Sequence, residues 1–247
     1  MYMINEIDRL FKKPERFPFA HIWEANLSID ELSTEIYKML SDAEKDRVQQ
    51  FVFAEDKKRF TLARYFLRGV LACYSRCEPS AVKIMQDGLN KPYIADSCNP
   101  DNVYFNLSYR ENYAYLIVSD CNNVGIDIEK HRHIDDIDQF ARDYFSETER
   151  KFLHSLSDSQ KQQYFFKFWS RKEAYIKAIG KGLSYSLTSF SCIKNKSALP
   201  FLQIPQDKTS LYWILQDLPA PDGYSAAWAI KNEERELHTE FFKYRIQ

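Results

Sequence analysis

Apolar residues follow a helical pattern along one long stretch of the chain, which predicts a helix over Gln160–Ile179. No proline or glycine interrupts this stretch, and Gly180-Lys181-Gly182 follows it as a typical helix end. The apolar side chains leave little polar circumference, so most of the helix is expected to be buried. Lys172, Glu173 and Lys177 nevertheless lie among them. Glu173 and Lys177 share one face, either as a plain ion pair at a helix edge or as groups with a function.

The remaining patterns predict an α+β protein whose two halves each consist of a strand, then helices, then several strands. Strands are predicted at Phe19–Asn26, Ala81–Met85, Val103–Leu107, Tyr113–Val118, Val124–Glu129, Leu187–Ile193, Leu211–Leu215, Tyr224–Ala229 and His238–Tyr244. Further helices are predicted at Asp30–Phe53, with a new N-cap at Ser41, and at Lys57–Arg76, Asp135–Tyr144 and Ser146–Leu156. The division falls between residues 121 and 122, and no low-complexity linker marks it. We therefore expect two closely packed subdomains, 1–121 and 122–247.

Composition excludes several classes of protein. The 247 residues are 45% hydrophobic and 15% aromatic, which indicates an ordered globular chain. The formal net charge of −1 argues against a nucleic-acid binder, and the six glycines form no phosphate-binding loop motif. No apolar run is long enough to span a membrane, and the first residues lack a signal pattern. Together with five scattered cysteines, interpreted as reduced thiols, this predicts a cytoplasmic protein.

A second group of acidic residues lies on the predicted strand Val124–Glu129. Strand alternation places Asp127 and Glu129 on one face, roughly 7 Å apart, where two carboxylates repel each other unless a cation is present. Mg²⁺ prefers carboxylate ligands together with water and phosphate. A strand that simply ends in solvent is the alternative. Combined with Glu173 and Lys177, however, the pair predicts metal-assisted phosphoryl chemistry.

Basic residues upstream are candidates for anchoring further phosphates. Arg64 lies on a basic stripe of the helix Lys57–Arg76, for which a solvated face is the alternative interpretation. Arg47 precedes this helix, and Lys91 follows it in a predicted turn. Either could bind phosphate as a point charge or, for the arginine, as a bidentate fork.

These residues resemble a known family, the 4′-phosphopantetheinyl transferases of the large, monomeric, surfactin-synthetase-activating type. Its two hallmarks, a G-[IV]-D-[IV]-E strand and a W-[SAC]-x-K-E-[AS]-x-x-K helix before G-x-G, appear as Gly125–Glu129 and Trp169–Lys177. Their order and spacing also match. Asn106-Leu107-Ser108 is similar to the family's N-[IVL]-S-H turn, and Lys91-Pro92 to its G-K-P turn. The resemblance extends over about residues 41–187.

The resemblance implies two α+β halves related by a pseudo-twofold axis, with coenzyme A bound in the cleft between them. The implied reaction transfers 4′-phosphopantetheine to a serine of an apo carrier protein of fatty acid, polyketide or nonribosomal peptide biosynthesis. It releases adenosine 3′,5′-bisphosphate. Asp127, Glu129 and Glu173 correspond to Mg²⁺ ligands, Glu129 directly or through water, and Glu173 also to the base. Lys177 would stabilise the leaving group.

Coenzyme A contacts are implied for a second set of residues, with nucleotide binding assigned to the N-terminal half. They are Arg47, Lys91, Asn106, Ser108, Tyr109 and Lys177. Two positions depart from the family pattern. Tyr109 stands where a histidine is usual, and a phenol can donate a hydrogen bond but brings no charge. Asn90 replaces the glycine before Lys91, although asparagine tolerates the same left-handed backbone.

Two other functions remain open at this point. A Mg²⁺-dependent nuclease or phosphodiesterase needs similar acidic and basic residues, but the near-neutral charge argues against it. A non-catalytic carrier-binding module would be expected to lack one acidic ligand or the lysine, and all are present. The aromatic side chains of residues 140–152 are interpreted as core, with a carrier-docking surface as the alternative.

Overall fold

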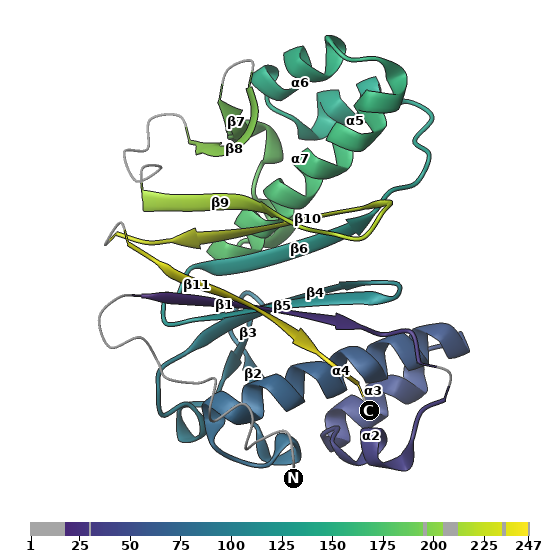
Figure 1. The fold of residues 1–247 in the computed structure, drawn as a ribbon, viewed down its shortest axis with the longest axis vertical. Helices are drawn as coiled ribbons and strands as arrows, with labels where there is room; N and C mark the ends of the chain where they lie inside the picture. The colour runs from purple at the N-terminus through teal and green to yellow at the C-terminus, as the bar shows by residue number, and fades with distance from the viewer. Residues whose placement is uncertain (1–17, 30, 195–196, 205–211, 234–235, 247) are drawn as a thin grey trace. The chain divides into compact units, whose positions relative to one another are not determined.

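The computed structural model describes residues 18–29, 31–194, 197–204, 212–233 and 236–246. These residues form two compact units (Figure 1). Unit 1 comprises the described residues of Met1–Gly88, Pro92–Asp120 and Leu237–Gln247, and unit 2 those of Leu89–Lys91 and Cys121–Glu236. Within the described ranges, every helix is too short or too polar to cross a membrane. All five cysteines carry free thiols.

Unit 1 is built around a four-stranded sheet in the order β11-β1-β5-β4. Its strands are β1 (Phe19–Asn26), β2 (Ile84–Gln86), β3 (Pro92–Ile94), β4 (Tyr104–Arg110), β5 (Tyr113–Ser119) and β11 (His238–Tyr244), and its helices are α2 (Thr34–Lys38), α3 (Asp42–Gln50) and α4 (Ala54–Ser75). Strands β2 and β3 pair separately. Short 3-10 turns occur at Pro79–Ala81 and Asp96–Cys98. The core consists of the apolar sides of α4 and the sheet.

The last strand of the chain completes the sheet of unit 1. β11 pairs in parallel with β1, whereas β5 pairs with β1 in the antiparallel sense. α4 packs closely on β11, because a Cβ added to Gly69 would lie 2.2 Å from the Tyr244 hydroxyl oxygen. The sequence division at residues 121 and 122 did not anticipate this return of the chain, because parallel pairing between distant segments leaves no local signal.

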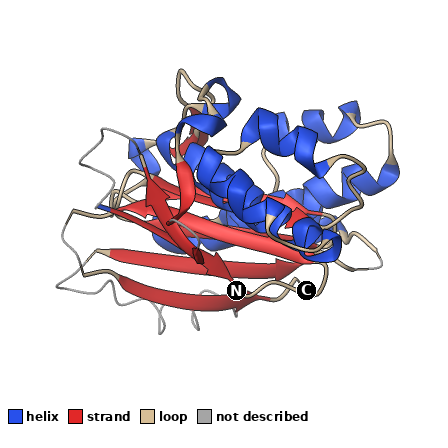
Figure 2. Ribbon diagram, turned by 90° about the horizontal axis from the view of Figure 1, so that it is seen from above, coloured by secondary structure: helices blue, strands red, loops and turns tan. Residues whose placement is uncertain are grey.

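Unit 2 contains a three-stranded antiparallel sheet in the order β6-β10-β9 and a two-stranded sheet of β7 and β8. Its strands are β6 (Val124–Lys130), β7 (Ser191–Lys194), β8 (Ser197–Gln203), β9 (Trp213–Leu218) and β10 (Tyr224–Lys231), and its helices are α5 (Ile137–Tyr144), α6 (Glu147–His154) and α7 (Asp158–Ile179), with 3-10 turns at Gly182–Ser184 and Leu187–Ser189. α7 packs across all three strands of the larger sheet. Viewed from above in Figure 2, helices of this unit lie over its strands.

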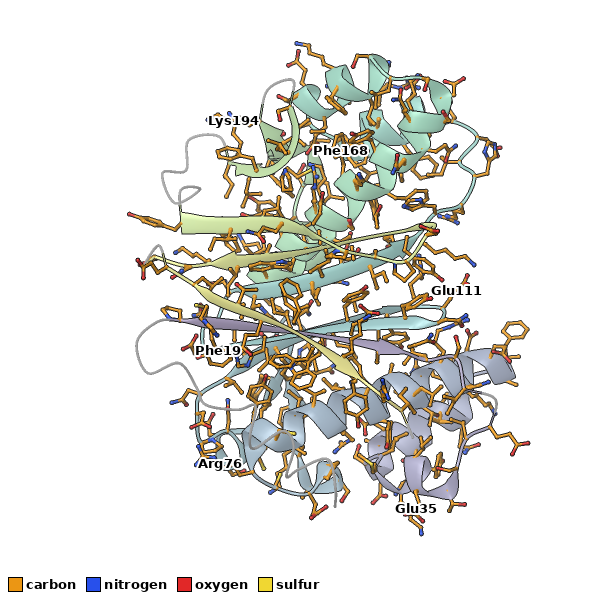
Figure 3. The ribbon with its side chains drawn as sticks, in the orientation of Figure 1. Phe19, Glu35, Arg76, Glu111, Phe168 and Lys194 are labelled. Carbon is orange, nitrogen blue, oxygen red and sulfur yellow. The ribbon has the colours of Figure 1, made fainter. Side chains whose placement is uncertain are left out.

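Aromatic side chains fill the core between α7 and its neighbours. Phe168 is fully buried, and Figure 3 shows it among the packed side chains of unit 2. The centroid of its ring lies 6.1 Å from the ring centroid of Phe145 and 5.6 Å from that of Phe152. Phe140 and Tyr144, by contrast, are 42% and 36% exposed. The aromatic residues of 140–152 therefore divide between core and surface.

The prediction of an α+β chain with two units is confirmed, and both units show the same order of strand, helices and strands. β1 and β11 have the predicted bounds, and the expected break at Ser41 is the capping box that begins α3. The end of the strand predicted at Val103–Leu107 was wrong, because β4 continues to Arg110 and only Glu111 and Asn112 connect it to β5. Strand β8 was missed. Leu211, the first residue of the strand predicted at Leu211–Leu215, and the first 17 residues, in which no signal pattern was found, lie outside the described residues.

Candidate active site

Gly125 sets the distance between the acidic strand and the long helix. Along β6, Val124, Ile126 and Ile128 are buried on one face, which leaves the opposite face for Gly125, Asp127 and Glu129. A Cβ at Gly125 would lie 2.1 Å from the Ala174 carbonyl oxygen and 2.5 Å from the Ala178 nitrogen. The glycine of the motif is therefore required because the α7 backbone occupies the space where a side chain would be.

This close approach brings Asp127 against the last turns of α7. Lys177 Nζ lies 2.6 Å from Asp127 Oδ1 and 3.4 Å from the Ile126 carbonyl oxygen. The aspartate side chain is 4% exposed and that of the lysine 28%, so the pair is largely shielded from water. Lys177 thus forms an ion pair with a carboxylate of the neighbouring strand, and its neighbour on the helix, Glu173, is not needed for this contact.

Glu173 lies in the electrostatic field of the same carboxylates. Burial raises the pKa of Glu173, Asp127 raises it further, Lys177 opposes the change and Glu129 adds to it, which brings the pKa to about 7. Such an effect indicates that the four charged groups lie within electrostatic range of one another. Asp127, Glu129, Glu173 and Lys177 therefore form one electrostatic group, whereas Lys172 does not belong to it.

The donor set fits a hard divalent cation by its chemistry. Asp127, Glu129 and Glu173 offer carboxylate oxygens, the ligands that Mg²⁺ prefers, and their mutual repulsion is what a cation relieves. Among the described residues, no three His, Cys, Asp or Glu side chains already form a metal-binding cluster. In this arrangement it is the ammonium group of Lys177 that compensates the charge of Asp127.

Lys172, the other charge predicted on a buried stretch of α7, has a structural partner. Its Nζ lies 2.9 Å from Glu149 Oε2, and both side chains are 0% exposed. The ammonium also donates to the carbonyl oxygens of Leu187 and Phe190, at 2.7 and 2.8 Å. Glu149 in turn accepts from the backbone nitrogen of Cys192, so the pair joins α6, α7 and β7. The sequence pattern did not single out Glu149, which also forms the capping box with Ser146 at the start of α6.

Lys91 lies beside the C-terminal end of α7. Its Nζ donates to the carbonyl oxygens of Ala178, at 2.8 Å, and Val124, at 3.3 Å. A cation at this end complements the helix dipole and satisfies a terminal carbonyl group. The lysine therefore places a positive charge next to the chain segments that carry Asp127 and Lys177.

Unit 1 contains a separate group of positive charges around Tyr109. Burial raises the pKa of the Tyr109 phenol, while the guanidinium groups of Arg64, Arg59 and Arg47 lower it. Glu44 holds Arg64 in place through an ion pair. Arg47 is exposed and lies over the Phe51 ring, 5.1 Å from its centroid. Arg59 was missed by the sequence analysis, although residues 57–59 are consecutively basic.

Asn106 and Ser108 do not share a face with Tyr109. All three lie on β4 rather than in the turn that was expected, and strand alternation separates them. Tyr109 packs on the core side, whereas Asn106 and Ser108, each 7% exposed, point to the other face of the sheet. The three side chains therefore do not lie together on one face of β4, where they could contact a single phosphate group. Their separate roles remain predictions.

Comparison with known proteins accounts for most of the chain. Residues 123–229 match the family model "4′-phosphopantetheinyl transferase superfamily", and residues 24–121 match "4′-phosphopantetheinyl transferase, N-terminal". The 4′-phosphopantetheinyl transferase HetI of Nostoc sp. is 33% identical over 212 residues, which cover 85% of this chain and 87% of that protein. Sfp, the 4′-phosphopantetheinyl transferase of Bacillus subtilis, is 29% identical over 188 residues, or 76% and 80% of the two chains.

A human protein with a phosphopantetheinyl transferase name is also similar to this chain. The human L-aminoadipate-semialdehyde dehydrogenase-phosphopantetheinyl transferase is 32% identical over 158 residues, which cover 61% of this chain and 51% of that protein. The residues that match the superfamily model, 123–229, include both the acidic strand β6 and helix α7 with Glu173 and Lys177. The chain belongs to the 4′-phosphopantetheinyl transferase superfamily and is an enzyme of that class.

Proposed function

We propose that this enzyme transfers the 4′-phosphopantetheine group of coenzyme A to a serine hydroxyl of an apo carrier protein in a Mg²⁺-dependent reaction. The observation that carries the proposal is the close approach of β6 and α7, which places Asp127, Glu173 and Lys177 around one region. Carboxylates and a lysine are the groups needed to neutralise a pyrophosphate and to assist its cleavage.

The metal is assigned to Asp127, Glu129 and Glu173, with Glu129 binding directly or through water. The chemistry of this donor set supports the assignment, because Asp127 and Glu129 raise the pKa of Glu173 and a divalent cation would relieve the repulsion among the three carboxylates. When bound, the ion would neutralise negative charge on the pyrophosphate of coenzyme A.

The residues of the chain then have separate tasks in the transfer. The serine oxygen forms a bond to the phosphorus that carries pantetheine, and the bond from this phosphorus to the bridging oxygen breaks. The bridging oxygen leaves with the electron pair, as part of adenosine 3′,5′-bisphosphate. Glu173 takes the serine proton, directly or through water, and its pKa of about 7 suits a base near neutral pH. Lys177 stabilises the charge on the departing phosphate.

The nucleotide phosphates are assigned to basic residues of both units. Lys91 in unit 2 has a fixed position at the end of α7, and Arg47 in unit 1 is exposed. Tyr109 replaces the usual histidine, and the guanidinium groups near it supply the positive charge that a phenol lacks. Asn106 and Ser108 are retained as candidate coenzyme A contacts.

The test is intact mass spectrometry of an apo carrier protein incubated with the enzyme, coenzyme A and Mg²⁺. A mass increase of one phosphopantetheine group is expected with Mg²⁺ and not with EDTA. Asp127→Asn should abolish the increase while circular dichroism shows that the protein remains folded, because the amide has the size of the carboxylate and Lys177 keeps the Ile126 carbonyl oxygen as an acceptor. If no carrier in a panel of unrelated apo carrier proteins gains mass, the proposal is overturned, whether or not the protein binds coenzyme A. Nuclease assays would then follow.

A further inference from the structure

A second ion pair ties α7 to the larger sheet of unit 2, at the edge opposite β6. The guanidinium group of Arg171 donates from Nε to Asp217 Oδ1 and from Nη2 to Asp217 Oδ2, each at 2.6 Å. Its Nη1 donates to the Ala198 carbonyl oxygen at 2.9 Å. The arginine side chain is 1% exposed and the aspartate side chain 36%. Because a two-pronged contact of this kind fixes direction as well as distance, Arg171 holds α7 on β9 in one orientation.

Asp217 lies in the same row of the sheet as Asp127. Ala227 on β10 is the register partner of Asp127 on β6 and also of Asp217 on β9. Residues opposite each other on neighbouring strands point to the same face, so all three side chains face α7. Ala227 is 0% exposed and belongs to the same core cluster as Ala174 of α7. The small alanine therefore lies under the helix, with an aspartate on either side of it.

Side chains of α7 reach these two aspartates from different sides of the helix. Lys177 pairs with Asp127, and Arg171, six residues earlier, pairs with Asp217. Each residue turns an α-helix by about 100°, so these two side chains leave α7 about 120° apart. A single contact would let the helix turn about its axis, whereas two contacts on different sides resist rotation in both senses. The two ion pairs thus fix how α7 is rotated over the sheet.

The rotation of α7 decides where Glu173 points. Glu173 is four residues before Lys177 and therefore projects about 40° from it around the helix, on the side of β6. Side chains extend about 5–6 Å from a helix axis, so a rotation of about 10° displaces their ends by about 1 Å. A displacement of about 1 Å between reacting groups can lower a rate about 100-fold. Loss of the contact at β9 is therefore expected to reach Glu173 and Lys177 through the helix.

The ion pair of Lys172 holds a third side of α7. It joins the helix to α6 and β7, outside the sheet that carries Asp127. The Lys172 ammonium also donates to the carbonyl oxygens of Leu187 and Phe190, so it keeps two acceptors without Glu149. This pair therefore stabilises the unit, whereas the contact at β9 is the one that relates the helix to the sheet itself.

We propose that Arg171 and Asp217 are positioning residues for the transfer reaction. They set the rotation of α7 and so hold Glu173 and Lys177 opposite Asp127. This role presupposes the function proposed above, in which those three residues act together. The effect passes through the helix, since the hydrogen bonds of Arg171 described above lie on the β8 and β9 side of α7. Groups that orient metal ligands without binding the ion themselves typically change metal affinity or activity about 10-fold to 100-fold.

The test combines carrier transfer with calorimetry of Mg²⁺ binding, the latter with coenzyme A present and carrier absent. Asp217→Asn keeps the size of the side chain but removes its charge and one of the two acceptor oxygens. It should lower kcat about tenfold, raise the Kd for Mg²⁺ about tenfold and leave the KM for coenzyme A within about twofold. Arg171→Lys should act in the same direction, because an ammonium group keeps the charge but cannot form the two-pronged contact. If Asp217→Asn does not fold, Arg171→Lys decides the outcome.

Two further variants separate positioning from stability. Asp138→Asn is the matched substitution, because the Asp138 side chain is 38% exposed and pairs at 3.7 Å with Lys161, near the start of α7. It should keep the wild-type kcat and Kd for Mg²⁺. Glu149→Gln should lower the urea midpoint of unfolding and keep both values in the folded protein. A lower urea midpoint with unchanged kcat and Mg²⁺ affinity in Asp217→Asn and Arg171→Lys would overturn the inference, and so would equal losses in Asp138→Asn.

Failure of the proposed function gives a different result. A wild-type enzyme that modifies no carrier overturns the proposed function and, with it, a role of Arg171 and Asp217 in transfer. If the wild type modifies its carrier and the variants bind Mg²⁺ and turn over as it does, the proposed function stands and only the positioning role is overturned.

Discussion

Replacing Gly125 with alanine is expected to separate β6 from α7 and to disrupt the site. The new Cβ would lie 2.1 Å from the Ala174 carbonyl oxygen, 2.5 Å from the Ala178 nitrogen and 3.0 Å from the Ala178 Cα. All three are backbone atoms of α7, so no side-chain rotation can relieve the contact. The helix or the strand must move as a whole.

The size of the required movement follows from these distances. Ordinary contacts begin near 3.4 Å, so the oxygen at 2.1 Å must retreat by about 1.3 Å. Inserting one methyl group into a packed core costs about 1–3 kcal/mol, and Gly125→Ala belongs at the upper end because the contact is with backbone. A shift of this size also breaks the 2.6 Å contact between Lys177 Nζ and Asp127 Oδ1.

Urea unfolding and the carrier transfer assay together test this reasoning. Gly125→Ala should lower the free energy of unfolding by about 3 kcal/mol and reduce kcat at least tenfold in the fraction that remains folded. Gly88→Ala is the control, because a Cβ at Gly88 would meet no atom within 4 Å. If Gly125→Ala unfolds at the wild-type urea concentration and transfers at the wild-type rate, the close approach has no such role.

Three further predictions concern other buried or charged groups. Lys172→Met should lower the free energy of unfolding by about 3–5 kcal/mol, because it leaves Glu149 charged and buried without its ammonium partner. Adding Glu149→Gln should restore part of this loss. A loss of less than about 1 kcal/mol for Lys172→Met in urea unfolding would contradict the prediction. Burial lowers the pKa of His21 from 6.5 to about 4, so the unfolded chain binds a proton that the folded chain rejects. Stability should fall from pH 6.5 to pH 4 by roughly 3 kcal/mol more in the wild type than in His21→Gln, and parallel stability curves would refute the assignment. Lys177→Ala should lower kcat more than it weakens coenzyme A binding measured by calorimetry, and a change confined to the KM for coenzyme A would assign it a binding role instead.

Local sequence patterns predicted those parts of the fold that depend on neighbours in the chain. The period of apolar residues gave the long helix α7, and alternation gave the face of β6 that carries Asp127 and Glu129. Serine residues marked the starts of α3 and α6, at Ser41 and Ser146. In each case the interacting groups are within a few residues of one another.

The motifs also predicted the residues of the candidate site, but not how they meet. Sequence spacing suggested Lys177 as a partner of Glu173 on the same helix, whereas the structure pairs it with Asp127 on a strand 50 residues away. That partner depends on Gly125, which allows the helix backbone to approach. Roles in catalysis, metal binding and coenzyme A binding stay predictions for the experiments above.

Only the tertiary structure decided the remaining features, because they depend on contacts between distant segments. The parallel pairing of β11 with β1, the burial of Lys172 on Glu149 and the gathering of arginines around Tyr109 have no local pattern. Sequence by itself determined most of the elements, the exposed and buried faces of β6 and α7, and the resemblance to the family. Packing decided which faces meet, since the free energy of burial depends on the whole core and not on any one segment.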